Sequence, residues 1–163
     1  MIHLETEFNL QDHINVICLP ESTNFTQFQG QNCFAAGWGQ SQSADNLQYS
    51  DILNYVNVPF VESKQCQNLL RTAFEEDNYA LDESFNCAGG KFGEDTCKGD
   101  GGGPLFCPLN ADPERFVQLG ITATGLWQCG KEGAPGIYAN VPNGICFIKI
   151  DTFCKVIFVF FRF

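Results

Sequence analysis

Nine cysteines in a chain of 163 residues constrain the fold more than any other feature of the sequence. None of them forms the Cys-x-x-Cys pairs that typically ligate zinc, so we expect disulfides, with no metal and no other cofactor. Disulfides persist in oxidising compartments, and the sequence therefore predicts a secreted, extracellular protein. The sequon Asn24-Phe25-Thr26, in which Asn24 would carry the glycan, fits that compartment.

The composition indicates one globular domain, because 44% of the residues are hydrophobic and 163 residues suffice for a single core. A net charge of −10 argues against nucleic acid and membranes as partners, since both attract basic patches. The apolar run Val156–Phe161 falls far short of the roughly 20 residues of a membrane span. Residues 1–5 lack the basic start and apolar run of a secretion signal, so we expect the N-terminal part of the protein to precede residue 1.

Turn residues and short apolar runs alternate through most of the chain, which is typical of an all-β domain. The segment Leu53–Val61 shows the alternation most clearly, with Val56, Val58 and Phe60 on one face. Further strands are predicted over 33–39, 85–88, 104–107, 116–123 and 136–141.

One short helix is predicted between these strands, from Ser63 through Leu70. Ser63 is the expected N-cap, because its hydroxyl can accept a hydrogen bond from the first free N–H groups of a helix. Leu69 and Leu70 would face the core.

The segment from Phe147 to Phe163 is dense in phenylalanine and allows two interpretations. It could form an aggregation-prone edge strand. We prefer the alternative that it lies outside the folded domain, because an exposed apolar tail is normally selected against.

The stretch Cys97–Leu105 carries the most specific motif, Cys-Lys-Gly-Asp-Gly-Gly-Gly-Pro-Leu. It resembles the active-site loop of trypsin-like serine proteases, Cys-x-Gly-Asp-Ser-Gly-Gly-Pro, with Gly101 in place of the nucleophilic serine. Glycine has no side-chain atom to attack a carbonyl, so the loop is either a protease loop kept for binding or an ordinary glycine-rich turn. A phosphate cradle is excluded, because the Gly-Lys-Ser/Thr ending is absent and Asp100 would repel phosphate.

Other segments are similar to the second half of the same family: 17–20, 36–39, 86–89 and 135–141. The resemblance runs from about residue 4 to about residue 142. It implies that residues 33–142 form the second antiparallel β-barrel of a chymotrypsin-like double barrel, with short helices and several disulfides. Residues 1–32 would be the end of the first barrel and the connector, and 143–163 an atypical C-terminal segment.

The family pattern also implies a set of disulfides. The implied pairs are Cys33–Cys107, Cys66–Cys87 and Cys97–Cys129, with Cys18 bound to a cysteine upstream of this chain. Cys146 and Cys154 are left over. On one continuous helix they would be about 12 Å apart, whereas a disulfide needs Cα atoms within about 7 Å, so a regular helix and a bridge between them exclude each other.

The resemblance places the catalytic histidine and aspartate of the family before the region where His3 lies. His3 and His13 lack the Ala-His-Cys setting of the catalytic base, and we expect neither to be catalytic. Gly99 and Gly101 would supply the N–H groups of a vestigial oxyanion hole. Asp100 matches the aspartate that pairs with the new N-terminus in activated members, so here it would be unpaired or hydrogen-bonded locally.

Asp95, Thr96 and Gly125 match a vestigial specificity pocket, in which a carboxylate favours a basic side chain. The alternative is that Asp95 is a solvated loop acid beside Glu94. The segment 123–125 reads Ala-Thr-Gly where the family usually has Ser-Trp-Gly, which puts substrate binding along that edge in doubt.

The glycine loop, with Lys98 before Gly99, looks most like that of the non-catalytic arthropod homologues that often carry a clip domain, including prophenoloxidase-activating cofactors and masquerade-like proteins. The resemblance implies an inactive homologue that binds proteases or zymogens of an extracellular immune cascade as a cofactor or scaffold. One alternative is an active endopeptidase whose Gly101 is an error and whose N-terminus is truncated. A truncated product that never folds is a third.

Overall fold

The computed structural model describes residues 5–6, 9–11, 14–20, 25–40, 48–110, 112–126, 128–148 and 156–158. Its strands are β1 (Asn15–Ile17), β2 (Asn32–Gly37), β3 (Asn54–Val61), β4 (Phe85–Gly89), β5 (Pro104–Leu109), β6 (Asp112–Thr124), β7 (Pro135–Asn140) and β8 (Val156–Phe158). Its helices are α1 (Ser63–Phe74), α2 (Val141–Ile148) and a short 3-10 helix, η1 (Thr26–Phe28).

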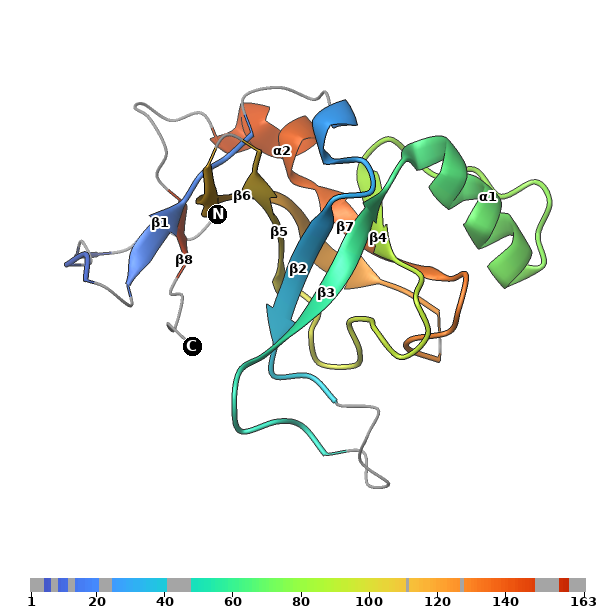
Figure 1. The fold of residues 1–163 in the computed structure, drawn as a ribbon, viewed down its shortest axis with the longest axis horizontal. Coiled ribbons are helices and arrows are strands. Elements are labelled where there is room, and N and C mark those ends of the chain that lie inside the picture. Colours follow the sequence, from blue (N-terminus) through green and yellow to red (C-terminus); the bar gives the residue numbers. More distant parts are fainter. Residues whose placement is uncertain are drawn as a thin grey trace.

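Six of the strands close an antiparallel barrel in the order β2-β3-β4-β7-β6-β5, with α1 packed outside β4 and β7 (Figure 1). The predicted fold class, an all-β barrel with short helices, is confirmed. Alternating side chains of the strands fill the barrel, and β3 shows why: Val58 is completely buried and Phe60 almost so, while Val56 packs against the same cluster. The period-two pattern of that segment therefore identified its inward face correctly.

Three disulfides tie the barrel to its surroundings, and they join the pairs that the family pattern implies. Cys33–Cys107 links β2 to β5, Cys66–Cys87 links α1 to β4, and Cys97–Cys129 links two surface loops. Among the described residues Cys18 carries no disulfide, and its Sγ accepts a hydrogen bond from Arg115 Nη2 at 3.5 Å. The upstream partner of Cys18 stays a prediction.

Helix α1 departs from the prediction at both ends. Its N-cap is Glu62, not Ser63: one carboxylate oxygen, Oε2, accepts hydrogen bonds from the N–H groups of Lys64 and Gln65, both at 3.1 Å. The longer glutamate side chain reaches back over the first turn, so Ser63 becomes the first helical residue. The helix continues to Phe74 and ends where Glu75 adopts a left-handed conformation, with φ of 57°. Leu70 is fully buried, as predicted.

The C-terminal region contains a helix and a strand. Asn140 ends β7, one residue before the predicted strand end, and its Oδ1 accepts a hydrogen bond from the N–H of Asn143 in the first turn of α2. Strand β8 pairs antiparallel with β1 in a two-stranded sheet separate from the barrel. Both interpretations of the tail stay predictions. Asn24 and Cys154 lie outside the described residues. In the part of the chain that the structure describes, no helix is long and apolar enough to cross a membrane.

The cap of α1 gives a direct test of this local geometry. Glu62→Ala should lower the free energy of unfolding by about 1 kcal/mol, because two N–H groups of the first turn lose their acceptor. Ser63→Ala is the matched control and should be close to neutral, since the cap does not use the Ser63 side chain. Thermal unfolding of the two variants decides between them, and a larger loss for Ser63→Ala would contradict the assigned cap.

Candidate functional site

The glycine loop, residues 97–103, is held by backbone hydrogen bonds to β6 and within the loop itself. The N–H of Gly102 donates to the carbonyl of Thr122 on β6 at 2.9 Å, and the N–H of Gly103 donates to the carbonyl of Asp100 at 2.9 Å. Gly99 and Gly102 have φ values of +99° and +87°, which side-chain-bearing residues rarely adopt. The loop is thus an ordered turn whose shape depends on glycine at these two positions.

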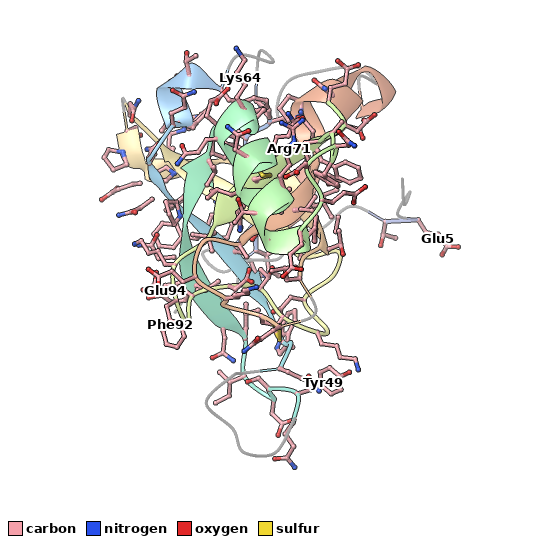
Figure 2. The ribbon with its side chains drawn as sticks, turned by 90° about the vertical axis from the view of Figure 1, so that its right-hand side faces the viewer. Glu5, Tyr49, Lys64, Arg71, Phe92 and Glu94 are labelled. Carbon is pink, nitrogen blue, oxygen red and sulfur yellow. A yellow bond between two sulfur atoms is a disulfide. The ribbon has the colours of Figure 1, made fainter. Side chains whose placement is uncertain are left out.

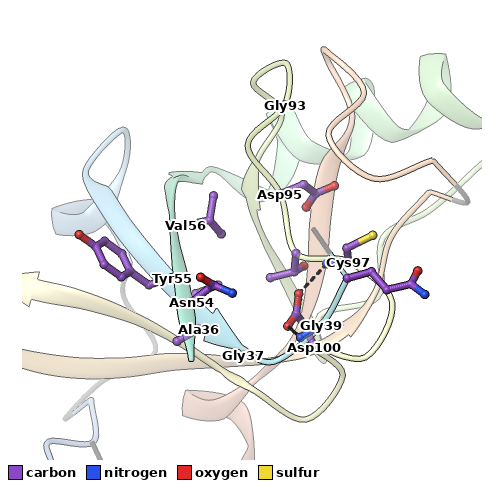
Figure 3. Close-up of a pocket in the computed structure, with 13 residues that line it drawn as sticks. Ala36, Gly37, Gly39, Asn54, Tyr55, Val56, Gly93, Asp95, Cys97 and Asp100 are labelled. Atoms are coloured by element: carbon purple, nitrogen blue, oxygen red, sulfur yellow. Dashed lines mark hydrogen bonds between the residues drawn. The ribbon is translucent and has the colours of Figure 1, made fainter. Parts of the chain in front are cut away.

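Asp100 is hydrogen-bonded on both carboxylate oxygens. Oδ1 accepts from the N–H of Gly39 at 2.7 Å, and Oδ2 accepts from the N–H of Cys97 at 2.8 Å (Figure 3). A β-carbon on Gly37 or Gly39 would collide with this carboxylate. Asp100 is therefore not left unpaired: it binds within its own loop and also holds that loop against the end of β2.

Gly101 differs from the other loop glycines, because nothing in its surroundings requires glycine. Its φ lies outside the left-handed region, and a β-carbon there would meet no atom within 4 Å. A β-carbon on Gly99, in contrast, would lie 2.6 Å from Cε1 of Tyr49. The N–H groups of Gly99 and Gly101 make no hydrogen bond to any described residue, so both are available as donors.

A pocket of about 1160 Å³ lies beside the glycine loop, and most of the residues named from the sequence line it. Gly99, Gly101 and Thr96 line it, and so does Gly125 on the segment after β6. A third part of the wall, residues 128–132, is held by the Cys97–Cys129 disulfide and by a hydrogen bond from the N–H of Gly93 to the carbonyl of Gly130 at 2.9 Å.

Asp95 lines a neighbouring pocket of about 540 Å³, together with Asp100 (Figure 3). Its Oδ2 accepts a hydrogen bond from the N–H of Gly130 at 3.0 Å, and its Oδ1 is buried without a partner among the described residues. Burial raises the pKa of this carboxyl, and the hydrogen bond from Gly130 opposes the rise. Asp95 is therefore a half-buried acid, not a solvated one, while Glu94 pairs with Lys91 at 3.7 Å.

Sequence reasoning missed several residues of the larger pocket, among them Thr122 and Phe92. Thr122 is only 7% exposed, and its Oγ1 has no hydrogen-bond partner among the described residues. Phe92 is 80% exposed at the rim. A polar residue inside the predicted strand 116–123 was the available signal for Thr122, whereas nothing in the sequence distinguished Phe92 from the many other phenylalanines.

Comparison with known proteins places this chain in a family. The sequence model of the family described as trypsin matches residues 1–148. The chain belongs to the trypsin family. The structure supports the same conclusion through its barrel, its three disulfides and the glycine loop. Within the described part of this trypsin-family chain, no group of three or more His, Cys, Asp or Glu side chains is placed to hold a metal ion.

Several curated relatives are similar over most of the chain. Phenoloxidase-activating factor 2 of Galleria mellonella is 39% identical over 143 residues, 88% of this chain and 46% of that protein. The Inactive CLIP domain-containing serine protease A28 of Anopheles gambiae is 37% identical over 79% of this chain and 32% of its own length. The Phenoloxidase-activating enzyme of Bombyx mori is 35% identical over 86% of this chain and 32% of its own length. The chain thus spans less than half the length of these relatives.

Alanine substitutions at Gly101 and Gly102 should change the free energy of unfolding in opposite directions. Gly101→Ala should raise the free energy of unfolding by about 0.4–1 kcal/mol, because the native backbone tolerates a side chain and the unfolded chain loses freedom. Gly102→Ala, the matched control, should lower it by about 1 kcal/mol or more, because alanine is strained at φ of +87°. Urea unfolding measures both changes, and equal losses would show that position 101 also requires glycine.

The raised pKa of Asp95 predicts a pH-dependent stability difference. The folded protein binds the proton of this carboxyl more tightly than the unfolded chain does. Protonated Asp95 therefore stabilises the folded state at low pH. That contribution is lost as the pH rises from the unfolded pKa, about 3.9, through the raised folded pKa. Asp95→Asn should therefore gain stability relative to the wild type across this window, as measured by urea unfolding from about pH 3 to about pH 8. A difference that is constant with pH would contradict the assignment.

Proposed function

We propose that this protein is a catalytically inactive serine protease homologue that binds other proteins in an extracellular cascade activating phenoloxidase. It would act as a cofactor or scaffold for a protease or a zymogen. The observation that carries the proposal is Gly101: the residue at the nucleophile position has no side chain, although the rest of the loop is ordered.

The surroundings of Gly101 favour a loop kept for binding over an ordinary turn. The two hydrogen bonds to the Asp100 carboxylate, the Cys97–Cys129 disulfide and the attachment to Thr122 all hold a loop that borders a pocket. Loops on a rigid barrel are where recognition usually resides, and the loss of a nucleophile leaves them unchanged. Phe92 adds a large apolar side chain at the rim, of the kind that anchors protein interfaces.

The cascade and the compartment rest on the relatives. Their names include phenoloxidase-activating factors and inactive CLIP domain-containing serine proteases. Secretion, a glycan on Asn24 and a bond from Cys18 to a further cysteine are proposed with this assignment. The division into a connector (1–32), a second barrel (33–142) and a C-terminal segment (143–163) is proposed in the same way.

An active endopeptidase is the second candidate, and two observations favour it. Position 101 has room for a serine side chain, and the Bombyx mori relative is named an enzyme. Resequencing the codon for residue 101 separates the two candidates directly.

Labelling and binding together test the proposal. A fluorophosphonate probe should leave the protein unlabelled, because no nucleophile is present at position 101. Immobilised protein should bind a cascade protease or its zymogen in surface plasmon resonance. Phe92→Ala should weaken that binding by about tenfold, as the loss of an interface anchor does.

Ile52→Ala is the matched control, since Ile52 is 75% exposed but does not line the larger pocket. It should bind like the wild type. Stoichiometric labelling would overturn the claim of inactivity, and equal affinity of Phe92→Ala and wild type would place the binding surface elsewhere.

A further inference from the structure

The larger pocket presents hydrogen-bond donors and positive charge, which is unexpected beside a glycine loop whose neighbouring pocket holds two carboxylates. Lys98 and Lys131 line it, and neither forms an ion pair within the described residues. Glu132 is the one acidic residue of its lining. The lining therefore carries a formal net charge of +1, on a protein whose total charge is −10.

Asp95 and Asp100 are near this pocket but do not line it, although Asp95 contacts Gly130 of its lining through a hydrogen bond of 3.0 Å. Asp95 and Asp100 line the smaller pocket, and both oxygens of Asp100 already accept N–H groups. Near the rim, Glu94 is paired with Lys91. Of the carboxylates in this part of the described chain, only Glu132 lines the pocket with the two lysines.

Neutral donors add to the two ammonium groups. The N–H groups of Gly99 and Gly101 have no partner among the described residues, and turns with glycine at positive φ expose such groups as anion-binding concavities. Thr122 lines the same pocket, more than nine-tenths buried, and its hydroxyl has no hydrogen-bond partner among the described residues. A buried hydroxyl without a partner is costly, so a ligand that accepts its hydrogen bond would recover that cost.

From these observations we infer that the larger pocket binds a carboxylate group of a partner protein, presented on an acidic segment. The inference rests on the proposed binding function and specifies the chemistry of that site. The carboxylate accepts hydrogen bonds from the Gly99 and Gly101 N–H groups and from the Thr122 hydroxyl. Lys98 and Lys131 balance its charge. Because Gly101 has no side chain, the pocket is open on the side of the glycine loop.

The carboxylate has two protein sources, an acidic side chain or a free C-terminus, and short peptides distinguish them. The first probe is an alanine peptide with blocked ends and one central glutamate; its control has glutamine in the same position. The second probe is an alanine peptide with a free C-terminal carboxylate; its control is the C-terminal amide. A blocked peptide with central lysine tests the opposite charge preference.

Amide chemical shifts of the isotope-labelled protein provide the measurement. At least one carboxylate peptide should shift the Gly99 and Gly101 signals saturably, while both neutral controls leave them in place. Lys98→Ala and Lys131→Ala should each weaken binding about twofold to fivefold, as expected for exposed charges. Raised salt should weaken it further.

Two variants make the result specific. Lys64→Ala removes an exposed lysine of α1, which lies far from Phe92 in Figure 2, and should leave peptide affinity unchanged. Thr122→Val should weaken binding and yet raise the melting temperature, because it removes a buried hydroxyl without a partner. If Thr122 served only stability, Thr122→Val would not combine weaker peptide binding with a higher melting temperature.

The inference is overturned if only the lysine peptide binds, if the glutamine control binds as well as the glutamate peptide, or if the Lys98 and Lys131 variants keep full affinity. Such a result would leave the proposed function intact, because labelling and cascade binding do not depend on the charge of the ligand. Fluorophosphonate labelling would instead remove the proposed function without altering the peptide shifts.

Discussion

The carboxylate of Asp100 holds the glycine loop against the segment that follows β2. Its two oxygens accept N–H groups from Gly39, just beyond the end of β2, and from Cys97, at the start of the glycine loop. Hydrogen bonds to an ionised acceptor are stronger than neutral ones, and this carboxylate makes one on each oxygen. Gly37 and Gly39 lack β-carbons where the carboxylate needs the space. The segments 36–39 and 99–101 therefore contact each other through the Asp100 carboxylate.

The closed barrel sets the frame on which this contact acts. Each of the six strands pairs with a neighbour on both sides, and the larger pocket is lined by loops and by the last residues of β6. Cys33–Cys107 joins two strands of the barrel, and Cys66–Cys87 joins α1 to it. Cys97–Cys129 joins two loops that line the larger pocket. The pocket is therefore cross-linked directly and does not depend on the strands alone for its shape.

Much of this architecture could be predicted from the sequence, because local patterns report on local structure. The alternation of Val56, Val58 and Phe60 gave the inward face of β3, and family spacing gave the three disulfides. The predicted N-cap of α1, Ser63, was wrong. The choice between Ser63 and Glu62 depends on how the longer glutamate side chain folds back over the first turn. The separation of Asp95 from the larger pocket and the unpartnered hydroxyl of Thr122 depend on which atoms meet across the barrel, and no sequence pattern records that.

The open space around Gly101 has an evolutionary consequence. Since the backbone there accepts serine, alanine or glycine without rearrangement, the fold forbids none of them and separates them only by a small difference in stability. Only a requirement for chemistry would preserve a serine at this position. Once a lineage used the protein for recognition alone, a single codon change could remove the nucleophile with no compensating mutation elsewhere, and the fold would keep no trace of the change.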